Sequence, residues 1–254
     1  MNIVALAKWV PNPEGTPALG SDYLLVRTGA EGALDPGDEF GVEAALRLVE
    51  AGGGEITVVS MGPDEALPAV QRALAMGAHR GVLVTDPTLR GADTLVTARV
   101  LAGAISRQPF DLVIAGVEST DGYTGTLPLT MAELLGVDAV TAVRHVEAVD
   151  GTLRVERQTE SGYDVVTCRP PAVIALTAGA NEPRYPSLKG IMVAKQKPLE
   201  RLSAEELGLS PDEVAPTQRV VAVEDAPPKA GGEIVGADEA VARVADLLAA
   251  AKVI

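Results

Sequence analysis

The sequence predicts an α/β protein whose mostly parallel sheet is covered by helices on both faces. Short, continuous apolar runs alternate with stretches of helical periodicity as far as Ala115, which is the pattern of buried parallel strands joined by helical crossovers. From Ala142 the apolar runs follow one another across turns instead, which predicts an antiparallel extension of the sheet. The chain has 254 residues, 47% of them hydrophobic, and can bury a sizeable core.

The predicted elements begin with an apolar strand at residues 3–7, before the loop at Pro11-Asn12-Pro13, and a possible short strand at 23–26. A helix is expected to begin near Asp38, after the turn and capping residues that start at Asp35, and to end at the glycines 52–54. The elements that follow are a strand at 56–60, a helix at 64–75, a strand at 81–84, a helix at 94–105 and a strand at 111–115.

The second half of the chain predicts a hairpin across Asp150-Gly151, further strands at 163–167 and 172–176, and then an extended arm. Beyond Asn181 the periodicity is lost among prolines, so we place a domain boundary between residues 1–180 and 181–254. Residues 237–251 have the pattern of a terminal helix, whose apolar residues suit docking on another subunit or packing on its own domain. That apolar set is Val241, Val244, Leu247 and Leu248.

Charge and composition exclude several classes of protein. The net charge of −14 would repel a phosphate backbone, and only 3% of residues are aromatic, so no nucleic-acid partner is expected. Cys168 is the single cysteine, which rules out an internal disulfide and a Cys-rich metal site and predicts a small core residue. Because no run approaches the roughly 18 apolar residues of a membrane span, we expect a soluble, cytoplasmic protein without membrane insertion.

The strongest candidate site runs from Gly116 to Pro128. Parallel sheets bind ligands beyond the carboxyl ends of their strands, and this stretch follows such a strand and precedes a helix. Its glycines, hydroxyls and free backbone N–H groups predict an anion cradle, and a glycine-rich turn without a ligand is the other interpretation. The stretch has neither the Gly-Lys-Ser/Thr ending of a Walker A loop nor a Gly-x-Gly-x-x-Gly fingerprint.

Other polar residues favour structural roles. Asp35, Asp38 and Glu39 could form a metal or acid/base cluster, but helix capping explains them better. His79 and His145 have no partner motif nearby, so packing or surface roles are expected. Because no nucleophile or acid/base constellation is present, the sequence predicts a protein that is not an enzyme.

Residues 181–198 combine prolines, apolar residues and basic residues in an otherwise acidic chain. Apolar side chains on a rigid loop rimmed by Lys and Arg suit a protein-docking surface. A packed crossover connection is the alternative, and the residues alone do not separate the two.

Taken in order, several segments of this chain resemble the β subunit of electron transfer flavoprotein from the first strand to the last helix. The most specific is Asn181-Glu182-Pro183-Arg184-Tyr185-Pro186, which leads into Leu188-Lys189-Gly190-Ile191-Met192. The others are Lys8-Trp9-Val10-Pro11, Asp35-Pro36-Gly37-Asp38-Glu39, Val58-Val59-Ser60-Met61-Gly62-Pro63 and Ala73-Leu74-Ala75-Met76-Gly77-Ala78.

The resemblance implies an adenine-nucleotide α-hydrolase-like (Rossmann-like) fold and a heterodimer with an α subunit that carries most of the FAD. It also implies that this subunit holds a structural AMP. The positions that match the family's AMP site are Leu6, Asp35, Pro36, Gly37, Asp38, Met61, Gly116, Val117, Glu118, Ser119, Thr120, Asp121, Gly122, Tyr123 and Thr124.

The same resemblance implies that the chain docks on flavin dehydrogenases such as acyl-CoA dehydrogenases and passes electrons through FAD to a membrane quinone reductase. Leu188 matches the apolar anchor of the family's recognition loop, and the arm with its terminal helix would pack on the α subunit. The positions that match the recognition segment are Arg184, Tyr185, Pro186, Leu188, Gly190, Ile191, Met192, Lys195 and Lys197.

Some positions depart from the family pattern. Asp35 replaces the usual Asn, Gln158 replaces a Glu connected with domain motion, and Pro13 lies near the place of a Tyr close to the flavin. Two other functions remain as alternatives: a bifurcating flavoprotein with a second FAD in place of AMP, and a stand-alone adenine-nucleotide-binding regulator. An uncharacterised small-molecule enzyme is disfavoured, because the chain has no catalytic constellation.

Overall fold

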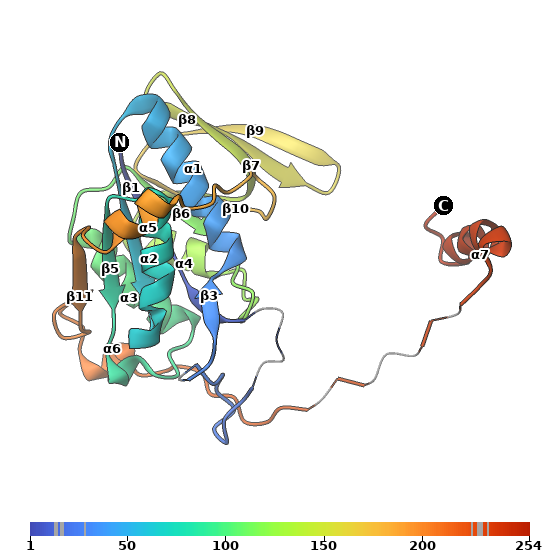
Figure 1. Ribbon diagram of the computed structural model, residues 1–254, viewed down its shortest axis with the longest axis horizontal. Coiled ribbons are helices and arrows are strands. Elements are labelled where there is room, and N and C mark those ends of the chain that lie inside the picture. Colours follow the sequence, from blue (N-terminus) through green and yellow to red (C-terminus); the bar gives the residue numbers. More distant parts are fainter. Residues whose placement is uncertain (13–14, 16–17, 28, 225, 228–230, 233) are drawn as a thin grey trace. The chain divides into compact units, whose positions relative to one another are not determined.

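The computed structural model describes residues 1–12, 15, 18–27, 29–224, 226–227, 231–232 and 234–254. These residues form two units, Met1–Val221 and Ala222–Ile254. The first unit is built on a nine-stranded sheet with the strand order β11-β5-β4-β1-β6-β10-β7-β8-β9 (Figure 1). Its strands are β1 (Asn2–Leu6), β4 (Glu55–Met61), β5 (Arg80–Val84), β6 (Leu112–Gly116), β7 (Asp138–Val149), β8 (Thr152–Thr159), β9 (Gly162–Cys168), β10 (Ala172–Leu176) and β11 (Leu199–Leu202).

The sheet confirms the predicted fold class. All neighbouring strands from β11 to β7 pair in parallel, and β7, β8 and β9 pair antiparallel as the predicted extension. The helices of the first unit are α1 (Pro36–Gly52), α2 (Leu67–Met76), α3 (Thr94–Ser106), α4 (Leu127–Leu135), α5 (Leu188–Ala194) and α6 (Pro211–Val214), with 3₁₀ turns η1 (Asp64–Ala66) and η2 (Pro87–Leu89).

Two hydrophobic cores lie on the two faces of the sheet. In β1, Ile3 and Ala5 belong to the core shared with α1 and α2, whereas Val4 and Leu6 belong to the core shared with α3 and α4. Successive side chains of a strand point to opposite faces, so a continuous apolar run is what a doubly covered strand requires.

Local sequence sets the ends of α1. The Asp35 side chain accepts a hydrogen bond from the backbone N–H of Gly37 as the N-cap, and Pro36 occupies the first turn, where its missing N–H costs nothing. The helix stops at Gly53, whose φ of 74° is one that glycine adopts without strain.

Short elements near the amino terminus differ from the prediction. Residues 23–26 form no strand; Leu25 makes only an isolated bridge with Leu19. Instead, β2 (Trp9–Pro11), for which the sequence predicts no strand, pairs antiparallel with β3 (Gly32–Leu34). A strand of three residues is too short to show a pattern, and its pairing depends on the partner segment.

The expected loss of structure beyond Asn181 is wrong, because residues 188–214 form α5, β11 and α6. Strand β11 pairs in parallel with β5, and the contacts divide the chain after Val221 rather than after residue 180. Three of the four residues of β11 are exposed, so the strand has little hydrophobic signature of its own.

The second unit contains α7 (Ala237–Ala250), as the periodicity predicts. Its apolar residues Val241, Val244 and Leu247 are exposed. None of the helices in the described part of the chain combines the length and the apolar character needed to cross a bilayer.

Candidate functional site

The candidate site lies at the carboxyl edge of the sheet. Leu6, Met61 and Gly116 are the last residues of β1, β4 and β6, and these strands are parallel neighbours in the order β4-β1-β6. The structure thus brings together segments that are far apart in the sequence, beside the amino terminus of α1. This arrangement agrees with the site that the sequence predicts at the strand ends.

Asp35 connects α1 to the loop that follows β6. Its side chain is fully buried, and besides capping Gly37 it accepts hydrogen bonds from the Thr120 N–H at 2.7 Å and the Thr120 Oγ1 at 2.8 Å. The prediction that helix capping explains this carboxylate is confirmed. The same carboxylate also fixes the loop, which a cap alone would not do.

Asp38 makes a second link between the same segments. Its carboxylate accepts from the Lys8 N–H at 2.7 Å and from the Gly116 N–H at 3.2 Å. Burial, reinforced by the charge of Asp35, raises the pKa of Asp38 to about 7, although the two backbone donors favour the ionised form. Asp38 therefore titrates close to neutral pH at the point where the loop leaves the sheet.

Two glycines allow the close approach of these segments. A Cβ on Gly116 would lie 3.1 Å from Asp38 Oδ1, and a Cβ on Gly37 would lie 3.0 Å from Asp35 Oδ1. Each distance is tighter than ordinary van der Waals contact, so a side chain at either position would push against a carboxylate. Close packing against the two carboxylates therefore explains why positions 37 and 116 are glycine.

The middle of the loop is held by a cluster of charges. Asp121 Oδ1 accepts from Lys8 Nζ at 2.6 Å, Asp121 Oδ2 accepts from an Arg27 guanidinium nitrogen, and Lys8 Nζ also contacts Ser119 Oγ at 3.1 Å. Burial opposes ionisation of Asp121, but the neighbouring Lys8 and Arg27 outweigh it and lower its pKa. No motif surrounds Arg27, so the sequence predicts no site role for it.

The end of the loop leaves backbone donors in front of α4. Within the described part of the chain, the N–H groups of Thr124, Gly125 and Thr126 make no hydrogen bond. Tyr123 precedes them with a positive φ of 48°, and its ring is exposed. Free N–H groups at a helix amino terminus are an anion-binding arrangement, so the geometry fits the predicted cradle.

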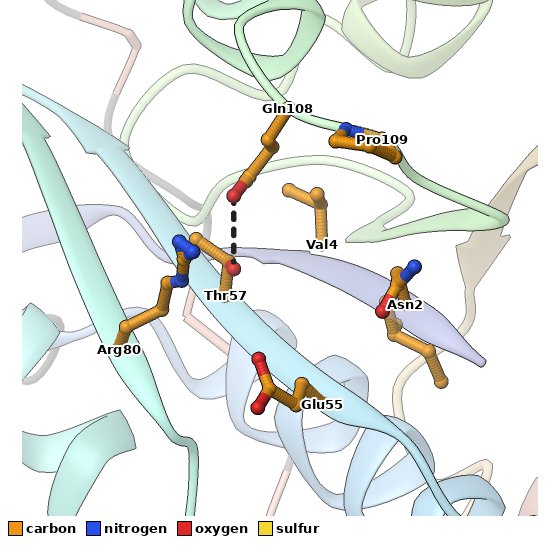
Figure 2. A pocket seen from close by; sticks show the side chains of 8 residues that line it. Asn2, Val4, Glu55, Thr57, Arg80, Gln108 and Pro109 are labelled. Carbon is orange, nitrogen blue, oxygen red and sulfur yellow. Dashed lines mark hydrogen bonds between the residues drawn. The ribbon is translucent and has the colours of Figure 1, made fainter.

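A separate pocket lies at the opposite edge of the sheet (Figure 2). It has a volume of about 110 Å³ and is lined by the amino-terminal residues Asn2, Glu55 and Arg80 of β1, β4 and β5. Across it, Thr57 Oγ1 lies 3.4 Å from Gln108 Oε1 (Figure 2). This pocket shares no residue with the candidate site.

The segment predicted to dock on partners, residues 184–197, exposes its apolar side chains. Leu188 is 83% exposed, Tyr185 89% and Met192 71%, and Ile191 is also exposed. Lys195 is exposed as well. A contiguous stretch of this kind is typical of an interaction surface.

Three residues predicted for docking have contacts with the rest of this chain. Arg184 forms ion pairs with Glu43 and Glu50 of α1. The Lys197 ammonium donates to the carbonyl groups of Leu74, in the last turn of α2, and of Ala78, just after it, and burial lowers the pKa of Lys197. A Cβ on Gly190 would lie 2.5 Å from the carbonyl oxygen of Ala75, so Gly190 permits α5 to pack on α2 (Figure 1).

The remaining candidate residues have structural partners. His79 Nδ1 accepts from the Ile56 N–H at 3.0 Å, Glu39 pairs with Arg72 at 3.1 Å, and Cys168 is buried as predicted. Among the residues that the structure describes, no three His, Cys, Asp or Glu side chains gather as metal ligands would. Pro13, for which the family resemblance implies a place near the flavin, lies outside the described residues.

Comparison with known proteins matches residues 22–207 to the family described as the electron transfer flavoprotein domain. The electron transfer flavoprotein subunit beta of Thermoanaerobacterium thermosaccharolyticum is 38% identical over 239 residues, which is 92% of each chain. The subunit of the same name from Mycobacterium tuberculosis is 39% identical over 242 residues, or 91% of each chain. The caffeyl-CoA reductase-Etf complex subunit CarD of Acetobacterium woodii is 34% identical over 241 residues, or 92% of each chain. The chain therefore belongs to the electron transfer flavoprotein family, among its beta subunits.

Proposed function

We propose that this chain is the β subunit of a heterodimeric electron transfer flavoprotein and that it holds AMP at the carboxyl edge of its sheet. The observation that carries the proposal is the preorganised loop between β6 and α4, in a chain that resembles β subunits over nearly its whole length. The FAD of the partner α subunit supplies the electron chemistry, and this chain contributes binding, orientation and docking.

A monophosphate suits the charges around the loop. Asp35 and Asp38 already use the Thr120 and Gly116 N–H groups, which leaves the donors in front of α4 for an anion. The cations Lys8 and Arg27 are both paired with Asp121, so the backbone donors in front of α4 are the groups that remain for a phosphate. These contacts support a phosphate at the loop, and the match to the family's AMP site is the reason to favour AMP.

The first test is the nucleotide content of the αβ complex, released by denaturation and identified by mass spectrometry. We expect one FAD and one AMP per complex. In Gly116→Ala the added Cβ presses on the Asp38 carboxylate, so AMP should be lost while FAD is retained. Gly52→Ala, where a Cβ meets no atom within 4 Å, is the matched control. A complex that retains AMP in both variants would contradict the assignment of the site.

A second candidate is a bifurcating protein in which another FAD occupies this site. The observation in its favour is the relative CarD, which is named as a subunit of a complex with a reductase. Two FAD and no AMP in the released nucleotides would establish this alternative. A chain that is stably monomeric without an α subunit would instead support a stand-alone nucleotide-binding regulator.

We further propose that the exposed side chains of residues 185–192 dock on flavin dehydrogenases such as acyl-CoA dehydrogenases, from which electrons pass to a membrane quinone reductase. Leu188→Ala removes the most exposed aliphatic side chain of the segment, and a truncated anchor residue costs about 2 kcal/mol of binding. The rate constant for reduction of the complex by a dehydrogenase should fall roughly 30-fold, since each 1.4 kcal/mol is tenfold. Leu134→Ala, an exposed leucine on α4, is the control.

A further inference from the structure

The segment that precedes the docking residues is attached to one face of α1. Asn181 Nδ2 donates to the Phe40 carbonyl at 2.9 Å, and Arg47 donates to the Glu182 carbonyl at 3.0 Å. Arg184 then donates to Glu43 and Glu50. Residues 40, 43, 47 and 50 are spaced three or four positions apart, so they lie along a single stripe of the helix.

Glu43 is the centre of this attachment. It is 2% exposed, its Oε2 accepts from Arg184 Nε at 2.7 Å and from the Arg184 backbone N–H at 3.3 Å, and its Oε1 accepts from Arg47 Nε at 2.7 Å. Burial opposes its ionisation, but the hydrogen bonds from Arg184 and Arg47 outweigh it and lower the pKa of Glu43. A buried carboxylate that is paired with two guanidinium groups holds them in a fixed geometry.

The other end of the segment is attached to α2. Ser187 Oγ accepts from the Gly190 N–H at 3.0 Å and caps α5, and the Lys197 ammonium donates to the carbonyl groups of Leu74 and Ala78. The guanidinium of Arg72 lies 5.9 Å from the centroid of the Tyr185 ring. The exposed apolar side chains therefore lie on a stretch of chain that is fixed on both sides.

We propose that Glu43 is a positioning residue for docking: it fixes Arg184 and so presents Tyr185 and Leu188 in the conformation that a partner binds. The inference rests on the proposed docking function of residues 185–192. A surface that is already ordered loses little conformational entropy when a partner binds. If the segment is displaced in some of the molecules, the apparent affinity falls in proportion to the fraction in which it remains ordered.

Glu43→Gln tests the proposal, because it retains the shape of the side chain and removes its charge. The amide can no longer accept from Arg47 and Arg184 at both of its ends, and both guanidinium groups lose the buried carboxylate that pairs with them. We expect amide hydrogen exchange in residues 185–192 to become roughly tenfold faster. Glu147→Gln, which breaks an ion pair with Arg154 on the β7–β8 hairpin, is the control and should leave this exchange unchanged.

A double-mutant cycle separates positioning from general stability. In the αβ complex, with a purified acyl-CoA dehydrogenase reduced by its acyl-CoA, Glu43→Gln should raise the KM for the complex roughly tenfold at unchanged kcat. In a Leu188→Ala background the same substitution should have a clearly smaller effect, because one of the two side chains that it positions is gone. Arg184→Lys, which keeps the charge and loses the planar fork, should repeat both results and serves if Glu43→Gln fails to fold.

The outcomes are distinguishable. Unchanged exchange in both Glu43→Gln and Arg184→Lys, or a Glu43→Gln effect that persists in full in the Leu188→Ala background, would overturn the positioning role. A Leu188→Ala complex that is reduced as fast as the wild type would overturn the docking proposal instead. In that case the exchange experiment would still decide whether Glu43 orders the segment.

Discussion

The buried Asp38 predicts a specific pH dependence of stability. Its pKa rises from an ordinary value of 3.8 to about 7 in the folded protein. Between these values the folded chain holds a proton that the unfolded chain has lost, so the free energy of unfolding falls as the pH rises. The slope is about 1.4 kcal/mol per pH unit well below the folded pKa and about half of that at pH 7, so the contribution of Asp38 decreases by about 2 kcal/mol from pH 5 to pH 7.

Asp38→Asn isolates this contribution, because the amide does not titrate. Its loss of one acceptor for the Lys8 or Gly116 N–H is a fixed cost at every pH. Urea unfolding of both chains at several pH values and constant ionic strength gives the difference in the free energy of unfolding. We expect the wild type to lose about 2 kcal/mol relative to Asp38→Asn between pH 5 and pH 7. A difference that stays constant over this range would refute the reasoning, and carboxyl NMR titration would then place the pKa directly.

Three further predictions concern the attachments of the carboxyl-terminal part of the first unit. Gly190→Ala should lower the free energy of unfolding by about 1–3 kcal/mol, since its Cβ would lie 2.5 Å from the Ala75 carbonyl oxygen, and an unchanged urea midpoint would contradict this. Lys197→Met removes the donor to the carbonyl groups of Leu74 and Ala78, so hydrogen exchange of the last backbone amides of α2 should become faster. Amide protection equal to that of the wild type would count against the role of this ammonium. Asp93→Ala removes the cap of α3 and the acceptor for Thr217. The free energy of unfolding should fall by about 1 kcal/mol, and proteolysis near residue 217 should become faster. Cleavage at the wild-type rate would show that this anchor is dispensable.

Hydrophobic patterning predicts the strands that are covered by helices on both faces. The runs that become β1, β4, β5, β6 and β10 are continuous and apolar because each is buried between two layers. The start of α1 is equally readable, since Asp35 and Pro36 have strong positional preferences. β11 was missed because its pairing with β5 comes from a distant segment and not from its own pattern.

The candidate site was predictable to the extent that it follows from topology. Parallel strands end at one edge, so Met61, Gly116 and the residues before α1 meet there. The contacts of Arg27 and Lys8 with Asp121 were not predictable, because they join loops about a hundred positions apart without a motif. The contacts of Arg184 and Lys197 were equally unpredictable. A basic residue in the sequence does not reveal whether it binds another protein or a helix of its own chain.

The late position of β11 has a consequence for synthesis of the chain on the ribosome. β5 is complete at Val84, but its outer neighbour in the sheet is built from Leu199–Leu202. A nascent chain that has folded β1, β4 and β5 therefore presents the backbone N–H and C=O groups of an uncovered strand until almost the whole first unit has emerged. Open strands of this kind recruit other chains. Translation that pauses before residue 199 should thus yield an aggregation-prone intermediate. Addition of β11 pairs β5 and leaves as the edge a four-residue strand that carries the charged residues Glu200 and Arg201.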